Sequence, residues 1–224
     1  MIEHEETPMS AQTIAESKCQ QIYAEAQAFF GQIPRPRNYG FKILYAPPFW
    51  QPPILFVGYQ PGGGDDDYER ETARGSDKHW PAMCEYATES WKLAKRMRQM
   101  FGRTFLERCV GVNAIFLRWP AVADYRRTLD KDTRAQIEAF CLARVTQIVE
   151  VIDPKKIVAV GFETLELFGA SMVDLANEKQ RTLTRIGKIA GRPAIGHAPF
   201  ERRTYFQAGP GSYTRPGFGF LVSN

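Results

Sequence analysis

Three stretches of the sequence place a polar side chain or glycines within or at the end of an apolar run. The run ILFVG at 54–58 leads into the turn YQPG at 59–62, Asn113 lies within VGVNAIFL, and PAIGH ends in His197. An amide inside an apolar run needs partners, because a buried unsatisfied polar group costs roughly 1–3 kcal/mol. We therefore treat Asn113 as a ligand-binding candidate. For His197, a purely structural role is the alternative.

The elements that must position these groups are short strands and amphipathic helices. Continuous apolar runs, as expected of strands buried on both faces, predict strands at 54–58, 110–117, 156–161 and 193–197. Helical spacing predicts helices at 10–30, 81–101, 132–152 and 162–168, with Asp132 or Thr133 capping the third. Their alternation predicts an α/β fold: a three-layer αβα arrangement with a central, mainly parallel four-stranded sheet.

The carboxyl ends of these strands are where a ligand is expected. In open parallel sheets, ligands bind beyond the carboxyl ends of the strands. The turn at 58–62, Asn113 and His197 should therefore meet at one crevice. The turn lacks the G-x-G-x-x-G spacing, so a dinucleotide site fits poorly, and a flexible surface loop is the alternative for glycines 62–64.

The 224 residues suit one domain, 1–224, with an N-terminal helix and irregular segment at about 10–50 and a Gly/Pro-rich tail at about 207–224. The net charge of +4 is compatible with a polyanionic partner and with any ordinary enzyme, so it decides nothing. The cysteines lack the spacing of a zinc site or a disulfide framework. No apolar run is long enough to cross a membrane. We expect a monomeric cytoplasmic protein that does not contact membranes.

Taken in order, these stretches resemble the uracil-DNA glycosylase superfamily. ILFVGYQPGGG, VGVNAIFL and PAIGHAPF are similar to its strand followed by G-x-x-P-G, its asparagine in the next strand, and its closing strand ending in histidine. VNAIFLRWP, EAFCLARVTQI and IDPKKIVAVG follow the order of its iron–sulfur branch. The resemblance extends over about 54–203. It implies hydrolysis of the N-glycosidic bond of uracil, or of another deaminated base, in DNA after the nucleotide is flipped out.

The resemblance also implies roles for individual residues. His197 matches the histidine that donates a hydrogen bond to the departing base. Asn113 matches the amide that reads the base edge with one acceptor and one donor. Trp80 is the candidate for stacking on the flipped base, with Tyr68 second. The turn residues expected to approach the sugar and phosphate are Gly58, Tyr59, Pro61 and Gly62.

The sequence departs from the family pattern at the catalytic turn. Gln60 stands where known branches have Asp, Asn or Ala, and Tyr59 stands where the iron–sulfur branch has Glu. A neutral amide cannot act as a general base, although it can orient a water molecule. The nearby carboxylates of Asp65, Asp66 and Asp67 are the alternative candidates for activating the water. The family chemistry requires no cofactor or metal.

The closing motif reads His197-Ala198-Pro199-Phe200 in place of H-P-S. Phe200 is then the candidate for the side chain that intercalates between the DNA bases. Arg202 and Arg203 are the candidates for binding DNA phosphates. Among the cysteines only Cys141 lies near a cluster-ligand position, so no iron–sulfur cluster is expected.

Two other functions are compatible with the same residues. A nucleic-acid-binding module that kept the fold and lost the chemistry is favoured by Gln60 and by the altered H-A-P turn. A hydrolase of free nucleosides or nucleotides is the third hypothesis.

Overall fold

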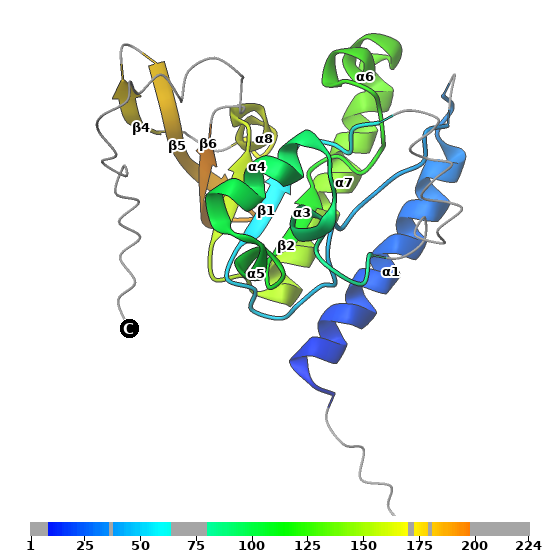
Figure 1. The fold of residues 1–224 in the computed structure, drawn as a ribbon. Coiled ribbons are helices and arrows are strands. Elements are labelled where there is room, and N and C mark those ends of the chain that lie inside the picture. Colours follow the sequence, from blue (N-terminus) through cyan, green and yellow to red (C-terminus); the bar gives the residue numbers. More distant parts are fainter. Residues whose placement is uncertain (1–8, 36–37, 64–79, 170–172, 179–180, 198–224) are drawn as a thin grey trace, which may run out of the picture.

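The computed structural model describes residues 9–35, 38–63, 80–169, 173–178 and 181–197. A six-stranded sheet with the order β2-β1-β3-β6-β5-β4 lies at its centre (Figure 1). The strands are β1 (Leu55–Gly58), β2 (Val110–Asn113), β3 (Ile157–Val160), β4 (Val173–Glu178), β5 (Arg181–Ile189) and β6 (Arg192–His197). Strands β2, β1, β3 and β6 are parallel, whereas β5 and β4 continue the sheet antiparallel.

The sheet differs from the predicted one because it has six strands rather than four and is mixed. The four predicted strands are all present, and β4 and β5 are additional. These two strands contain many polar and charged residues (VDLANE and RTLTRIGKI), so they lack the continuous apolar run of a strand buried on both faces. Val173 in β4 is 62% exposed, as expected at the edge of a sheet.

The four predicted helices have counterparts in the structure, and the helices at 103–106 and 122–128 are additional. The helices are α1 (Ala11–Gln32), α3 (Glu85–Thr88), α4 (Lys92–Phe101), α5 (Arg103–Leu106), α6 (Val122–Thr128), α7 (Lys131–Ile152) and α8 (Phe162–Glu166). The predicted helix 81–101 is two helices, since the backbone is extended at Glu89 and Trp91; Arg98 donates a hydrogen bond of 2.6 Å to the Glu89 carbonyl. The cap of α7 is Asp130, not Asp132 or Thr133.

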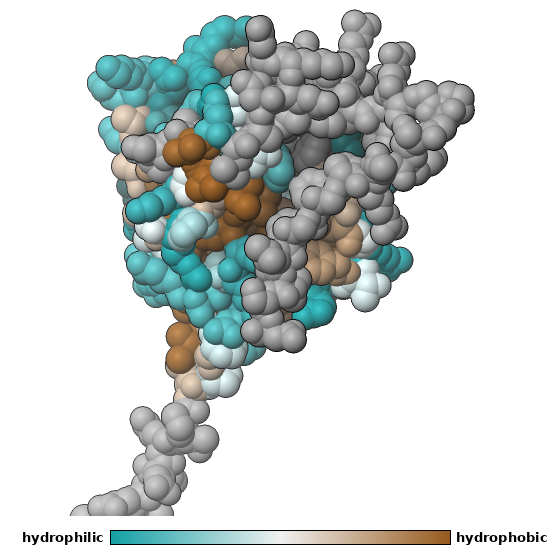
Figure 2. All heavy atoms as spheres, turned by 90° about the vertical axis from the view of Figure 1, so that its left-hand side faces the viewer, coloured by the Kyte–Doolittle hydropathy of each residue, from teal (hydrophilic) through white to brown (hydrophobic). Residues whose placement is uncertain are grey.

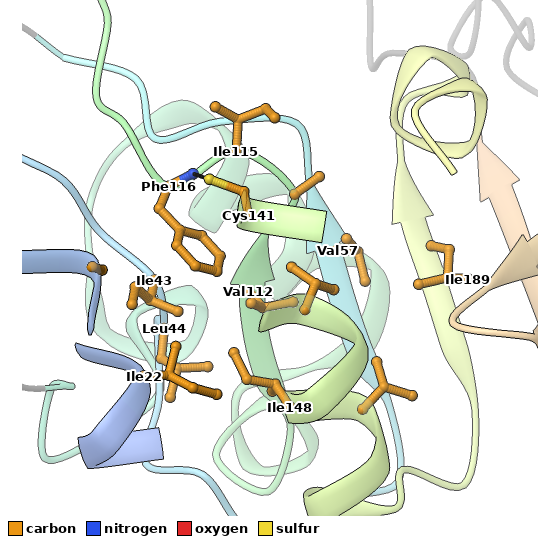
Figure 3. Packing of buried hydrophobic residues seen from close by; sticks show 14 of the residues in the cluster. Ile22, Ile43, Leu44, Val57, Val112, Ile115, Phe116, Cys141, Ile148 and Ile189 are labelled. Atoms are coloured by element: carbon orange, nitrogen blue, oxygen red, sulfur yellow. Dashed lines mark hydrogen bonds between the residues drawn. The ribbon is translucent and has the colours of Figure 1, made fainter. Parts of the chain in front are cut away.

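Buried side chains form two clusters, one on each face of the sheet. Leu55 and Val57 of β1 pack in the cluster that includes α1 and α7, whereas Phe56 between them packs with α3, α4 and α5. This alternation is the two-residue period of a strand. Figure 3 shows the first cluster, in which the Cys141 sulfur accepts a hydrogen bond of 3.4 Å from the backbone N–H of Phe116.

The outer edge of β2 is covered by the chain segment 40–45, which we call the arm. Its backbone bonds to the segment 111–118 through Lys42 N to Phe116 O (2.8 Å), Asn113 N to Ile43 O (3.1 Å) and Tyr45 N to Gly111 O (2.8 Å). The arm thus lies beside the end of β2, where the candidate amide is found. None of the described helices has the length and apolar composition needed to cross a lipid bilayer.

Candidate functional site

The carboxyl ends of the parallel strands bring the predicted groups to one edge and one face of the sheet. Gly58 pairs with Asn113 across β1 and β2, and Val160 pairs with His197 across β3 and β6. Gly58 lies two residues after Phe56, so both lie on the face covered by α3 and α4, and Asn113 shares this face because it pairs with Gly58. His197 lies on the same face, because Ile195, two residues earlier, pairs with Val158 of the same cluster. Three strand spacings, about 14 Å, separate Asn113 from His197.

Asn113 is 1% exposed, and both ends of its amide are bonded to the arm. Its Nδ2 donates to the Lys42 carbonyl (3.1 Å), and its Oδ1 accepts from the Tyr45 hydroxyl (3.4 Å). A Cβ on Gly58 would lie 3.2 Å from the same Oδ1. Glycine at 58 therefore leaves the space that the amide occupies.

The turn after β1 is bonded along its length to the chain that follows β2. The carbonyls of Gly58, Tyr59 and Pro61 accept from the backbone N–H groups of residues 114, 115 and 119, at 2.7, 2.8 and 3.2 Å. The Gly62 carbonyl accepts from the guanidinium of Arg118 (2.8 Å), a residue only 4% exposed. These bonds fix the backbone of the turn next to Asn113.

Gln60 projects from this turn with its amide oriented by the protein. Its Nε2 donates to the Trp119 carbonyl (3.1 Å). Its Oε1 is buried and has no hydrogen-bond partner within the described part of the chain. A buried acceptor without a partner is costly, and an ordered water commonly fills such a position. Gln60 can therefore hold a water molecule but cannot remove its proton.

His197 ends β6 on the same face as Asn113 but two strands away from Gly58. Its Nδ1 lies 3.5 Å from the Thr184 hydroxyl, and its carbonyl accepts from Gly161 N (3.1 Å). Burial lowers the pKa of the imidazole, so the ring is neutral at neutral pH. His197 lines a small apolar hollow with Met97 and Met100 of α4. That hollow does not include Asn113 or Gln60.

The candidate residues Trp80 and Tyr59 are both aromatic, and each contacts a helix. Trp80 lies edge-on to Tyr23 of α1, with 6.1 Å between ring centroids, and packs against the cluster of that helix. The Tyr59 hydroxyl accepts from Arg126 (3.2 Å), which also pairs with Glu163 (3.2 Å). Tyr59 therefore contacts α6 through Arg126. Stacking of Trp80 on a base stays a prediction.

Several predicted residues lie outside the described residues. They are Asp65, Asp66, Asp67, Tyr68, Phe200, Arg202 and Arg203.

Two polar residues that contact Asn113, Lys42 and Tyr45, were not predicted from the sequence. Lys42 is 7% exposed, and its Nζ pairs with Glu85 Oε1 at 2.7 Å. Tyr45, three residues after Lys42, contacts the amide itself. The sequence did offer one indication, namely the cations Lys42 and Arg118 inside the apolar runs FKILY and IFLRWP. A buried cation needs an ion pair or hydrogen bonds, so such a position predicts polar partners nearby.

Among the described residues, the side chains next to the turn do not form a metal site. No group of three or more His, Cys, Asp or Glu side chains suited to a metal ion occurs among the described residues. All four cysteines are buried free thiols.

We expect these thiols to be unreactive in the folded protein. Burial raises the pKa of Cys84 to about 11 and those of Cys19, Cys109 and Cys141 to about 12, so little thiolate is present at pH 8. A disulfide reagent such as DTNB should modify none of them rapidly until guanidinium is added. A thiol that reacts at the rate of free cysteine in native protein would contradict this placement.

Comparison with known proteins adds no further assignment. Neither a protein-family model nor a curated protein matches this chain.

Proposed function

We propose that this protein is a monofunctional DNA glycosylase that hydrolyses the N-glycosidic bond of uracil, on a three-layer scaffold like that of the uracil-DNA glycosylases. One observation carries the proposal. Asn113 and Gly58 are in contact at the end of two parallel strands, and His197 ends another parallel strand on the same face. The motifs that resemble the family thus supply an amide, a glycine turn and an imidazole to one edge of the sheet.

The flipped base would lie over the tips of β1 and β3, between Asn113 and His197. The second Nδ2 hydrogen of Asn113 pairs with uracil O4, and the remaining lone pair of Oδ1 accepts from N3–H. The neutral imidazole of His197 donates to the oxygen that gains charge as the glycosidic bond breaks. Glycines 58 and 62 let the backbone approach the sugar and phosphate.

The water that attacks C1′ would be held by the Oε1 of Gln60, which has no hydrogen-bond partner among the described residues. Its Nε2 bond to the Trp119 carbonyl keeps that oxygen fixed. Orientation of water without a general base suits a mechanism in which the base departs before the water adds. No metal or cofactor takes part in these steps.

The test is base release from oligonucleotides that carry one uracil, hypoxanthine or xanthine, each as single and double strand. Cleavage by alkali after incubation reports the abasic site. The expected result is uracil release, with no cleavage of matched strands that carry only normal bases. Reaction of free deoxyuridine but of no oligonucleotide would instead identify a nucleoside hydrolase.

A second candidate is a binding module of the same fold without catalysis. The observation that favours it is Gln60, which is neutral and already bonded to the Trp119 carbonyl. Such a module would bind uracil-containing or abasic DNA tightly and leave it intact after long incubation. Binding measured beside the release assay separates the two candidates.

A further inference from the structure

The amide of Asn113 is held from one side by the arm, and this contact sets its orientation. The Lys42 carbonyl can only accept, so the amide nitrogen must face it, as the 3.1 Å bond shows. The Tyr45 hydroxyl then lies next to Oδ1 and donates to it (3.4 Å). Rotation of the amide by half a turn would set Oδ1 against the Lys42 carbonyl, where two acceptors repel.

The two arm residues are themselves fixed. Their backbone N–H groups bond to Phe116 O and Gly111 O, both at 2.8 Å, and the Tyr45 carbonyl accepts from Glu85 N at 2.8 Å. The Lys42 Nζ pairs with Glu85 at the start of α3. The Tyr45 ring stacks on Tyr86, with centroids 5.3 Å apart. The group that orients Asn113 is therefore part of the packing between the arm, α3 and the sheet.

Amide orientation decides which base edge can pair. Uracil offers an acceptor at O4 and a donor at N3–H, which match Nδ2–H and Oδ1 as they are placed. Cytosine offers a donor at its amino group and an acceptor at N3, which an amide could match only after half a turn. An amide free to rotate would therefore accept both bases.

We propose that Tyr45, together with the Lys42 carbonyl, is a positioning residue that prevents rotation of Asn113 and so excludes cytosine. The inference rests on the proposed glycosylase function for its substrate and on the Asn113 contacts for its geometry. Burial raises the pKa of Tyr45, so its hydroxyl stays protonated and can donate.

The test replaces Tyr45 by phenylalanine, which removes only the hydroxyl. The Tyr45→Phe variant should lose about tenfold in uracil-over-cytosine discrimination, measured by release or by binding of oligonucleotides, since one hydrogen bond is removed. Solvent exchange of the Asn113 side-chain amide, observed by NMR and assigned with Asn113→Asp, should be about tenfold faster. Tyr125→Phe is the matched control, because the Tyr125 hydroxyl is buried and without a hydrogen-bond partner among the described residues.

The two readouts keep this inference separate from the glycosylase proposal. If the wild type releases uracil and Tyr45→Phe changes neither discrimination nor amide exchange, the positioning role is overturned. If the wild type releases no base, the proposed function fails, and amide exchange alone decides: faster exchange in Tyr45→Phe supports positioning, and unchanged exchange overturns it. Thermal unfolding of each variant confirms that it is folded.

Discussion

Replacement of His197 by alanine should slow uracil release by roughly 100- to 1,000-fold, the loss seen when one preorganised donor to a developing oxyanion is removed. The backbone of His197 is held in place, because its strand is bonded to β3 on one side and to β5 on the other. Since burial lowers the pKa of the imidazole, the neutral ring donates without a change of protonation. Single-turnover release with enzyme in excess measures the chemical step directly.

Two variants make the result specific. His197→Gln retains an N–H donor of similar reach and should recover part of the lost rate. Thr184→Val removes the hydroxyl 3.5 Å from Nδ1 and should have a much smaller effect than His197→Ala. An unchanged rate in His197→Ala would remove His197 from the reaction and leave it a structural histidine.

Replacement of Asn113 by aspartate should reverse the base preference. The carboxylate has two acceptors and no donor, so it repels uracil O4 and can accept from the cytosine amino group. Uracil release should fall by roughly 5- to 150-fold, which corresponds to the roughly 1–3 kcal/mol of a buried polar group left without its partner. Release from matched uracil and cytosine oligonucleotides, expressed as a ratio, is the measurement.

The aspartate also loses the donor to the Lys42 carbonyl, so a lower unfolding midpoint is expected beside the change in preference. Asn38→Asp is the matched control. Asn38 is exposed, and its Oδ1 accepts from Gly40 N, a bond that aspartate keeps. A ratio that stays the same in Asn113→Asp would place Asn113 outside the base pocket.

The parallel half of the fold could be predicted because burial on both faces leaves a continuous apolar run in each strand. The strands at 55–58, 110–113 and 157–160 carry this signal, whereas in 192–197 only Ala194 and Gly196 are buried and the apolar run is shorter. β4 and β5 do not carry it, since an antiparallel edge needs few apolar side chains. The break near Glu89 was also missed. There Arg98 bonds to the Glu89 carbonyl, a contact that helical periodicity cannot show.

The candidate site likewise has some features that the sequence pattern predicts and others that depend on tertiary contacts. The sequence predicted that Asn113 and the glycine turn would meet at one crevice, because both were assigned to the carboxyl ends of parallel strands. In the structure these two strands are neighbours, and Gly58 pairs with Asn113. The partners of Asn113 were not predicted, because Lys42 lies 71 positions earlier and bonds through a backbone carbonyl, which leaves no trace in residue type. The packing of Trp80 against Tyr23 likewise depends on where α1 lies, which no local pattern specifies.

The chain that follows β2 is hydrogen-bonded on both flanks, to the glycine turn on one side and to the arm on the other. These three segments therefore form one mechanical unit, and none of them can shift alone without breaking backbone bonds. A displacement of the turn by a bound ligand would have to be accommodated by the arm and, through the Lys42–Glu85 ion pair, by the start of α3. Substitutions in the arm should thus change ligand affinity even at positions that no ligand touches.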